Sequence, residues 1–252
     1  MTEREILQHI DNGANYYVSI FGEAVHMDKV DQEYYSYVKP KAGEQGISFI
    51  YNVHIENLSP EQKKAVIDEM KSMNMPIWLD LLVSDETASI FSGKERKQEQ
   101  TKSGEDAETY LAILPEEKRE CPINSDQVLR VHTADEFAAW AQTANDVLAG
   151  GNPDLHPVHH FPLCEKGIMK CYTMYSGGMP VSVAAIIDNH GIASLEFVAT
   201  VPEARRRGFA RAVCAKAVWE AFSDGASIIT VRAADSAAAK LYQSIGFRTY
   251  GG

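Results

Sequence analysis

The feature that most constrains this chain lies near its carboxyl end, where residues 195–247 predict strand, turn, helix, strand and helix in succession. Apolar and polar residues alternate over 195–200, which is the period of a strand with two unlike faces. Apolar residues then recur at helical spacing over 212–222, and a glycine follows that can cap the helix. A β-branched run at 228–231 predicts the next strand, and residues 237–244 predict the last helix.

The turn between the first strand and the first helix reads Arg205-Arg206-Arg207-Gly208-Phe209-Ala210. Backbone N–H groups are unpaired at a helix start and the helix dipole adds partial positive charge, so this turn suits an anion such as a pyrophosphate. Gly208 lets the backbone approach the anion closely, and the small side chain of Ala210 adds little bulk to the first helical turn. Taken alone, the turn is equally compatible with an exposed helix start that carries solvated arginines.

A second signature follows at Ala238-Ala239-Lys240-Leu241-Tyr242-Gln243-Ser244-Ile245-Gly246-Phe247. In their order and separation, the two signatures resemble the acetyl-CoA site of the GCN5-related N-acetyltransferase (GNAT) superfamily, over about residues 128–247. The resemblance implies an α/β (α+β) fold, with a mixed, mostly antiparallel sheet flanked by helices. It also implies an N-acetyltransferase that uses acetyl-CoA as cosubstrate and transfers the acetyl group directly to a primary amine.

The resemblance assigns the cofactor site residue by residue. Backbone groups of three strand residues would pair with the pantetheine arm, and the turn with the first helical residues would hold the pyrophosphate. These residues are Val198, Ala199 and Thr200 on the strand, and Arg206, Arg207, Gly208, Phe209, Ala210 and Arg211 in the turn and helix. The N–H of Val198 is the candidate donor to the thioester carbonyl. Ser236 stands where family members often carry a cofactor-contacting asparagine, and serine has a shorter reach.

Two residues are candidates for proton transfer. Tyr242 matches the tyrosine that protonates the coenzyme A thiolate in many GNAT enzymes, and a phenol with an ordinary pKa near 10, above that of a thiol, suits this role. The alternative interpretation of Tyr242 is a core tyrosine on the last helix. Glu196 is the candidate general base, relaying a proton through water. Because the family's base is not fixed in position, Glu196 could instead bind a cationic substrate.

The composition narrows the function classes. The chain has 252 residues with 24 basic and 35 acidic side chains, a net charge of −11 that argues against sequence-independent binding of nucleic acid. No apolar stretch is long enough for a membrane span, and the charged first ten residues do not resemble a signal peptide. Four cysteines without CxxC spacing predict reduced thiols, and hence a cytoplasmic protein.

Two domains are predicted, over residues 1–120 and 127–252, separated by a charged, proline-bearing stretch. In the first, a capping signature at 59–62 predicts a helix and residues 76–83 predict a buried strand, in an order similar to that of the carboxyl-terminal half. Lysines stand where the later copy has arginines and Gly208. The first half is therefore predicted to be a degenerate GNAT-like half or an accessory α/β domain, and a coincidental similarity of β-α-β units is the alternative.

Residues 150–164, predicted as a loop, contain three histidines near a cysteine, but their spacing fits no standard zinc site, and no metal is predicted. The chain ends five residues after Phe247, where the last strand of a GNAT domain would be cut short. The acceptor side is therefore expected to be open or completed by another segment.

The predicted acceptor is a small-molecule or peptide amine, and the protein is predicted to be a monomer or homodimer. Two alternatives to N-acetylation remain. One is a non-catalytic protein that binds or senses coenzyme A, and the other is an acyltransferase for another acyl-CoA or a hydroxyl acceptor. A P-loop nucleotide hydrolase is disfavoured because no Gly-Lys-Ser/Thr follows Gly208.

Overall fold

The computed structural model describes residues 1–91, 108–118, 127–148 and 155–251. Two compact units make up the chain. Residues 14–107 form the amino-terminal unit, and residues 1–13 with 108–252 form the carboxyl-terminal unit. This division differs from the boundary expected at 121–126, because the strand at 109–113 pairs with strands of the carboxyl-terminal unit.

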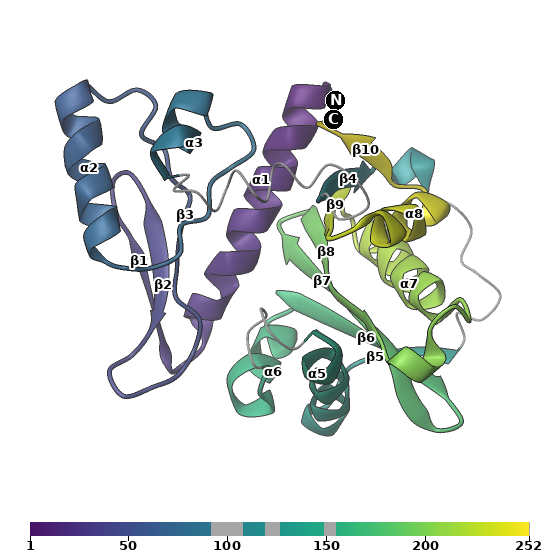
Figure 1. Cartoon of the computed structure of the whole chain (residues 1–252). Coiled ribbons are helices and arrows are strands. Elements are labelled where there is room, and N and C mark those ends of the chain that lie inside the picture. The colour runs from purple at the N-terminus through teal and green to yellow at the C-terminus, as the bar shows by residue number, and fades with distance from the viewer. Residues whose placement is uncertain (92–107, 119–126, 149–154, 252) are drawn as a thin grey trace. The chain divides into compact units, whose positions relative to one another are not determined.

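The sheet of the carboxyl-terminal unit has seven strands in the order β10-β4-β9-β8-β7-β6-β5 (Figure 1). Their bounds are β4 Thr109–Ile113, β5 Val128–Arg130, β6 Met169–Ser176, β7 Met179–Asn189, β8 Ile192–Thr200, β9 Ile228–Ala233 and β10 Arg248–Tyr250. Neighbouring strands are antiparallel except for β8 and β9, which run parallel. The prediction of a mixed, mostly antiparallel sheet flanked by helices is confirmed.

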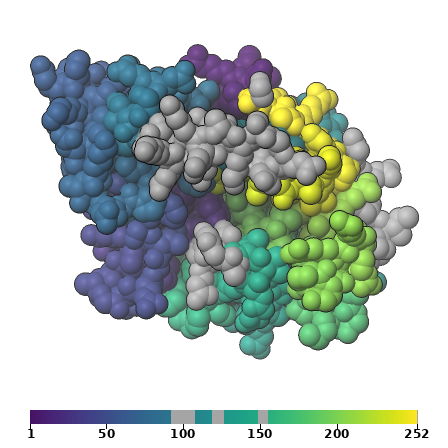
Figure 2. Space-filling model, viewed as in Figure 1, coloured from purple at the N-terminus to yellow at the C-terminus, as the bar shows by residue number. Residues whose placement is uncertain are grey.

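Helices cover both faces of this sheet (Figure 1). They are α5 Ala134–Leu148, α6 Pro157–Glu165, α7 Phe209–Ser223 and α8 Ser236–Ile245. Helix α7 is apolar on nearly all sides and packs with α8 on one face, where the largest core of the unit lies. Helix α5 packs on the other face, where the buried Trp140 donates from Nε1 to the carbonyl oxygen of Ala184 at 3.1 Å. Parts of α8 and β10 reach the surface of this unit (yellow in Figure 2).

The short last strand is completed by β4, which lies between β9 and β10. Ala112 of β4 is opposite Arg248 of β10, and Leu111 is opposite Val231 of β9. Leu111 is fully buried, so β4 contributes to the core as well as to the hydrogen-bonded sheet. Of the two alternatives for this end of the sheet, the pairing agrees with a contribution from another segment, residues 109–113.

Helix α1 (Glu3–Ile20) contributes its first residues to the carboxyl-terminal unit. A Cβ atom on Gly13 would approach Oγ1 of Thr230 to 2.9 Å and Cβ of Ser194 to 3.6 Å. At the start of the helix, Glu3 accepts a hydrogen bond from the N–H of Gly251 at 3.5 Å. This part of α1 therefore packs on the sheet face opposite α7.

No described helix combines the length and the apolarity needed to cross a membrane.

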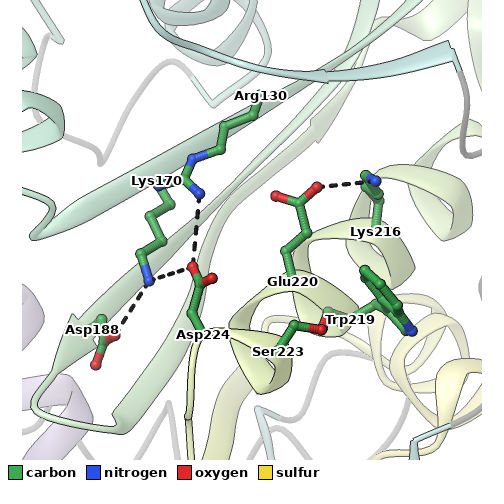
Figure 3. Close-up of polar contacts among 8 residues, drawn as sticks. All are labelled: Arg130, Lys170, Asp188, Lys216, Trp219, Glu220, Ser223 and Asp224. Atoms are coloured by element: carbon green, nitrogen blue, oxygen red, sulfur yellow. Dashed lines mark hydrogen bonds and ion pairs between the residues drawn. The ribbon is translucent and has the colours of Figure 1, made fainter.

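An ion-pair network joins β5, β6, β7 and the end of α7 (Figure 3). Nζ of Lys170 lies 3.4 Å from Oδ2 of Asp188 and 2.9 Å from Oδ2 of Asp224, and Nη1 of Arg130 lies 3.7 Å from the same oxygen of Asp224. Only 10% of the Lys170 side chain is exposed, so solvent screens its charge weakly. The network fixes the carboxyl end of α7 to the outer strands.

The amino-terminal unit contains a smaller sheet, in the order β1-β2-β3 with antiparallel pairs. Its elements are β1 Met27–Asp31, β2 Ser36–Pro40, β3 Phe49–Tyr51, α2 Pro60–Ser72 and α3 Asp85–Phe91. The predicted capping box is confirmed, since Ser59 and Gln62 each accept a hydrogen bond from the other's backbone N–H. The predicted strand at 76–83 is wrong, because this segment forms only a single parallel bridge, from Ile77 to Ile50.

The connections of the amino-terminal unit repeat those of the larger one. Three antiparallel strands, a helix, a parallel partner for the third strand and another helix occur in the same order in both units. In the amino-terminal unit the parallel partner is reduced to the single bridge. This order agrees with the prediction of a degenerate second copy.

Candidate active site

The candidate site begins where β8 and β9 stop pairing. Their parallel register includes Ile192 with Ile228 and ends with Ser194 opposite Thr230. Both strands continue beyond this point, β8 to Thr200 and β9 to Ala233. Beyond Ser194, the described residues of β8 and β9 are therefore no longer paired with each other. Free N–H and C=O groups on a strand edge can accept an extended ligand as an additional strand.

A bulge bends β8 at this opening. Ala199 is opposite Val183 and Glu196 is opposite Ala185, so two residues of β8 lie across from one residue of β7. Phe197 occupies the bulge with φ of 53°, in the left-handed region that non-glycine residues seldom adopt. Its ring packs edge-on against Trp140, with 5.6 Å between the ring centroids.

The bulge interrupts the alternation of inward and outward residues that was expected for this strand. Leu195 and Phe197 were predicted on one face, but Phe197 packs against α5 whereas Leu195 and Val198 pack into the core below α7. The extra residue reverses the alternation, because two residues on the bulged strand face one on its partner. Glu196 precedes the bulge and lies two residues after Ser194, so it shares the face of Ser194, which is the face covered by α1 and α5.

The predicted phosphate turn lies at the end of β8, directly beside this opening. Arg206 has φ of 59°, and Gly208, at the N-cap of α7, has φ of 83°. A Cβ atom on Gly208 would have no neighbour within 4 Å, so the turn is open. The described residues offer no acceptor to the N–H groups from Arg206 to Arg211, whereas the N–H of Ala212 donates to the carbonyl of Gly208. Free N–H groups at a left-handed turn and a helix start suit an anion.

The side chains around the turn leave its backbone accessible. Arg205, Arg206, Arg207 and Arg211 are exposed. Nε of Arg205 donates to the carbonyl of Thr200 at 3.1 Å, which holds the turn against the strand end. The Arg207 guanidinium lies 4.8 Å from the ring centroid of buried Phe209. Ala210, half-buried in the first turn of α7, adds no bulk there.

Glu196 is half-buried at the opening and forms no ion pair with the described residues. Burial raises the pKa of Glu196 from 4.5 to about 7, against the opposing effects of the Arg232 guanidinium and the Ser194 hydroxyl; the charge of Glu108 adds to the increase. A carboxylate with a pKa near neutrality is suited to general base catalysis.

Tyr242 lies on α8 and is 5% exposed, in the core on the α7 side of the sheet. Burial raises its pKa well above the ordinary value, and Cys214, Glu196 and Asp235 add to this effect. The phenol is therefore protonated at neutral pH. Glu196, on the opposite face of the sheet, is among the charges that raise the pKa of Tyr242.

Ser236 is the first residue of α8, and Asp235 is the N-cap. Oδ1 of Asp235 accepts from the N–H of Ala238 at 2.7 Å, so the aspartate, and not the serine, caps this helix. Ser236 is half-buried. Its position at the start of the last helix leaves the predicted cofactor contact as a hypothesis.

Sequence reasoning missed three residues near Glu196. Arg232 of β9 is opposite Tyr110 of β4, and Nη1 of Arg232 lies 4.0 Å from Oε1 of Glu108. The Tyr110 hydroxyl donates to Oε2 of Glu108 at 3.1 Å. Glu108 directly follows the polar stretch 92–107, and no local pattern links it to a strand near residue 232. Only the pairing of β4 with β9 reveals this group.

The histidine-rich segment is a helix, and the predicted loop is wrong there. Helix α6 begins with Pro157 at its first position, and Nδ1 of His156 accepts from the N–H of Val158 at 3.3 Å. Proline fits a first helical turn and the imidazole caps it, which the sequence analysis overlooked. The described residues contain no group of three histidine, cysteine or acidic side chains that could hold a metal ion.

The comparisons with known proteins concern the family and the fold. Residues 160–252 match the acetyltransferase (GNAT) domain family. A GCN5-related N-acetyltransferase from Kribbella flavida has a similar structure over 96% of this chain and 92% of its own, with a TM-score of 0.59 and 16% identity. A GCN5-related N-acetyltransferase from Sphaerobacter thermophilus is similar over 87% of this chain and 79% of its own, with a TM-score of 0.55 and 14% identity.

These similarities show the GNAT fold, and their reach over nearly the whole chain is consistent with a GNAT-like amino-terminal half. A putative acetyltransferase of the GNAT family from Novosphingobium aromaticivorans is 18% identical, with a TM-score of 0.43 over 58% of this chain, which spans 62% of that protein's length. No curated protein sequence matches this chain significantly.

Proposed function

We propose, from the premise that residues 160–252 carry a GNAT acetyltransferase domain, that this protein transfers an acetyl group from acetyl-CoA directly to a primary amine. The observation that carries the proposal is the point where β8 separates from β9, beside an open turn with free N–H groups. An extended thioester with a diphosphate at its far end needs both features, in this order along the strand.

The residues of the opening fit acetyl-CoA. We infer that backbone groups of Val198, Ala199 and Thr200 pair with the pantetheine arm. The turn from Arg206 to Arg211 would receive the pyrophosphate through its N–H groups, with the exposed arginines adding positive charge. Ser236 would lie at the cofactor through the first turn of α8.

Bound acetyl-CoA would supply a thioester carbonyl as the electrophile. Glu196 takes a proton from the attacking amine, directly or through water, as the nitrogen bonds to the carbonyl carbon. The N–H of Val198, at the bulge, donates to the oxygen on which negative charge develops. Tyr242 gives its proton to the departing sulfur as the carbon–sulfur bond breaks. Because Glu196 and Tyr242 lie on opposite faces of the sheet, the amine would lose its proton on one side and the thiolate would gain one on the other.

The acceptor is an amine of a small molecule or peptide, and its identity is left to experiment. The carboxylates of Glu196 and Glu108 near the opening support a cationic acceptor. Cysteines that form no disulfide in the described residues support a reducing, cytoplasmic setting. Nothing in this mechanism requires more than one copy of the chain, so a monomer or a homodimer would serve.

The test is acetyl transfer, measured by mass spectrometry of the products with a panel of amines and acetyl-CoA. We expect Tyr242→Phe and Glu196→Gln to lower kcat about 100-fold or more while acetyl-CoA affinity is retained, because each removes one proton transfer. Binding of acetyl-CoA without transfer to any amine would favour the non-catalytic alternative. Transfer to hydroxyl compounds alone, or only from longer acyl-CoA donors, would favour the other alternative.

A further inference from the structure

Glu196 shares its sheet face with two other charged side chains from strands far apart in the sequence. Ser194 is opposite Thr230, so Glu196 and Arg232, each two residues further along its strand, lie on one face. Arg232 is opposite Tyr110 of β4, and Glu108 lies two residues before Tyr110. The register therefore places Glu196, Arg232 and Tyr110 on one face of the sheet, and Glu108, just before β4, joins this row of charges through its contact with Arg232.

The contacts in this row are unequal. Nη1 of Arg232 is 4.0 Å from Oε1 of Glu108, whereas Arg232 and Glu196 form no ion pair within 4.0 Å. The Arg232 side chain is 17% exposed and that of Glu108 is 46% exposed. The Tyr110 hydroxyl, 3.1 Å from Oε2 of Glu108, orients that carboxylate. The guanidinium thus contacts the carboxylate of Glu108, whereas it acts on Glu196 across more than 4.0 Å.

We propose that Arg232 and Glu108 are positioning residues for Glu196: Glu108, delivered by β4, holds the guanidinium of Arg232 and so keeps it from closing onto Glu196 as an ion pair. A glutamate locked to an arginine is a poor proton acceptor, because the ion pair stabilises its charged form. A base on this strand needs the cation near enough to hold it in place and too far to neutralise it. This inference rests on the proposed function of Glu196 as the general base.

The groups around Glu196 on other elements do not duplicate this role. Helix α8 and its N-cap contribute Tyr242 and Asp235, neither of which carries a positive charge. Across the sheet, β7 places uncharged Ala185 opposite Glu196. Helix α1 approaches this face through Gly13, which carries no charge. Arg232 is therefore the cation that acts on Glu196 in the described part of the chain.

The experiment compares Arg232→Gln and Glu108→Gln with the wild type. Glu116→Gln is the control, because Glu116 is exposed on the segment that follows β4 and undergoes the same change of charge. The first readout is titration of the Glu196 side-chain carbon by NMR in protein labelled with ¹³C-glutamate, assigned with Glu196→Gln. The second is the pH dependence of acetyl transfer.

We expect the Glu196 midpoint to rise by about one pH unit in Arg232→Gln, because the favourable charge is lost. In Glu108→Gln it should fall, by less, because the partly exposed Glu108 is screened by solvent. Arg232→Lys should return the midpoint toward the wild-type value. The acid limb of the transfer profile should move in the same directions, whereas a purely structural defect would lower the rate at every pH.

Midpoints that do not move relative to Glu116→Gln, or that move in the same direction in both variants, would overturn the inference. Thermal melting of each variant establishes that the fold is retained. If no amine is acetylated, the proposed function fails, but the NMR titration still tests the row of charges. If transfer occurs and the midpoints stay fixed, the proposed function stands and the role of Arg232 and Glu108 does not.

Discussion

Replacing Glu196 by glutamine should stabilise the protein at neutral pH by an amount that the burial of this carboxyl determines. Its folded-state pKa of about 7 exceeds the ordinary value of 4.5 by about 2.5, and each pKa unit corresponds to about 1.4 kcal/mol. Between these two pH values the folded protein binds more protons than the unfolded chain, so stability is lost as the pH rises through this window. The full loss is about 3 kcal/mol, and glutamine avoids it.

The assay is urea unfolding of the wild type and Glu196→Gln at pH 5, 6, 7 and 8. The difference in unfolding free energy should be below about 1 kcal/mol at pH 5, rise steadily, and approach about 3 kcal/mol at pH 8. Because other titrating groups are common to both proteins, their contributions cancel in the difference. Glu116→Gln, at an exposed glutamate, should show a difference near zero at every pH.

A difference that stays constant from pH 5 to pH 8 would refute this reasoning, because it would mean that Glu196 titrates alike in the folded and unfolded states. If the difference in unfolding free energy fell as the pH rises, the pKa of Glu196 would be lowered on folding, which would indicate a carboxylate stabilised by Arg232. Either result would also remove the basis for a base that is half-ionised near neutral pH.

Three further substitutions test the packing around the site, each by thermal or urea unfolding. Lys170→Met should cost about 2 kcal/mol, since two aspartates lose their weakly exposed cation, and high salt should recover little of it. Gly13→Ala should cost about 1–3 kcal/mol, because the added methyl group would lie 2.9 Å from Oγ1 of Thr230, and Thr230→Ala should relieve part of the cost. Trp140→Phe should cost about 1–3 kcal/mol, because it empties space in a full core and leaves the Ala184 carbonyl without its donor.

The carboxyl-terminal elements could be predicted from the sequence because their signals are local. Helical spacing, the glycine after each helix and the β-branched run at 228–231 located α7, β9 and α8 to within a few residues. The open turn at Gly208 also followed from local rules, since a positive φ and a helix start favour glycine there. The predicted site residues lie along β8, in this turn and on α8, and their roles remain proposals.

The parts that could not be predicted depend on contacts between distant residues. The placement of β4 between β9 and β10 leaves no periodic trace in the sequence, so Glu108 was not connected with Arg232. The bulge on β8 places a phenylalanine, not a glycine, at positive φ, so the residue types in this strand did not indicate a bulge. Packing of Phe197 against Trp140 supports this conformation, and that contact spans two elements.

The most direct test of the account is calorimetric titration of acetyl-CoA into the wild type, Gly208→Asp and the control Gly43→Asp. The two glycines have nearly equal φ, 83° and 85°, and neither has a neighbour within 4 Å of an added Cβ, so backbone strain is matched. A carboxylate at Gly208 would repel the diphosphate from the free N–H groups. We predict that Gly208→Asp binds acetyl-CoA at least 100-fold more weakly while Gly43→Asp binds as the wild type does, and equal affinity in all three proteins would contradict the account.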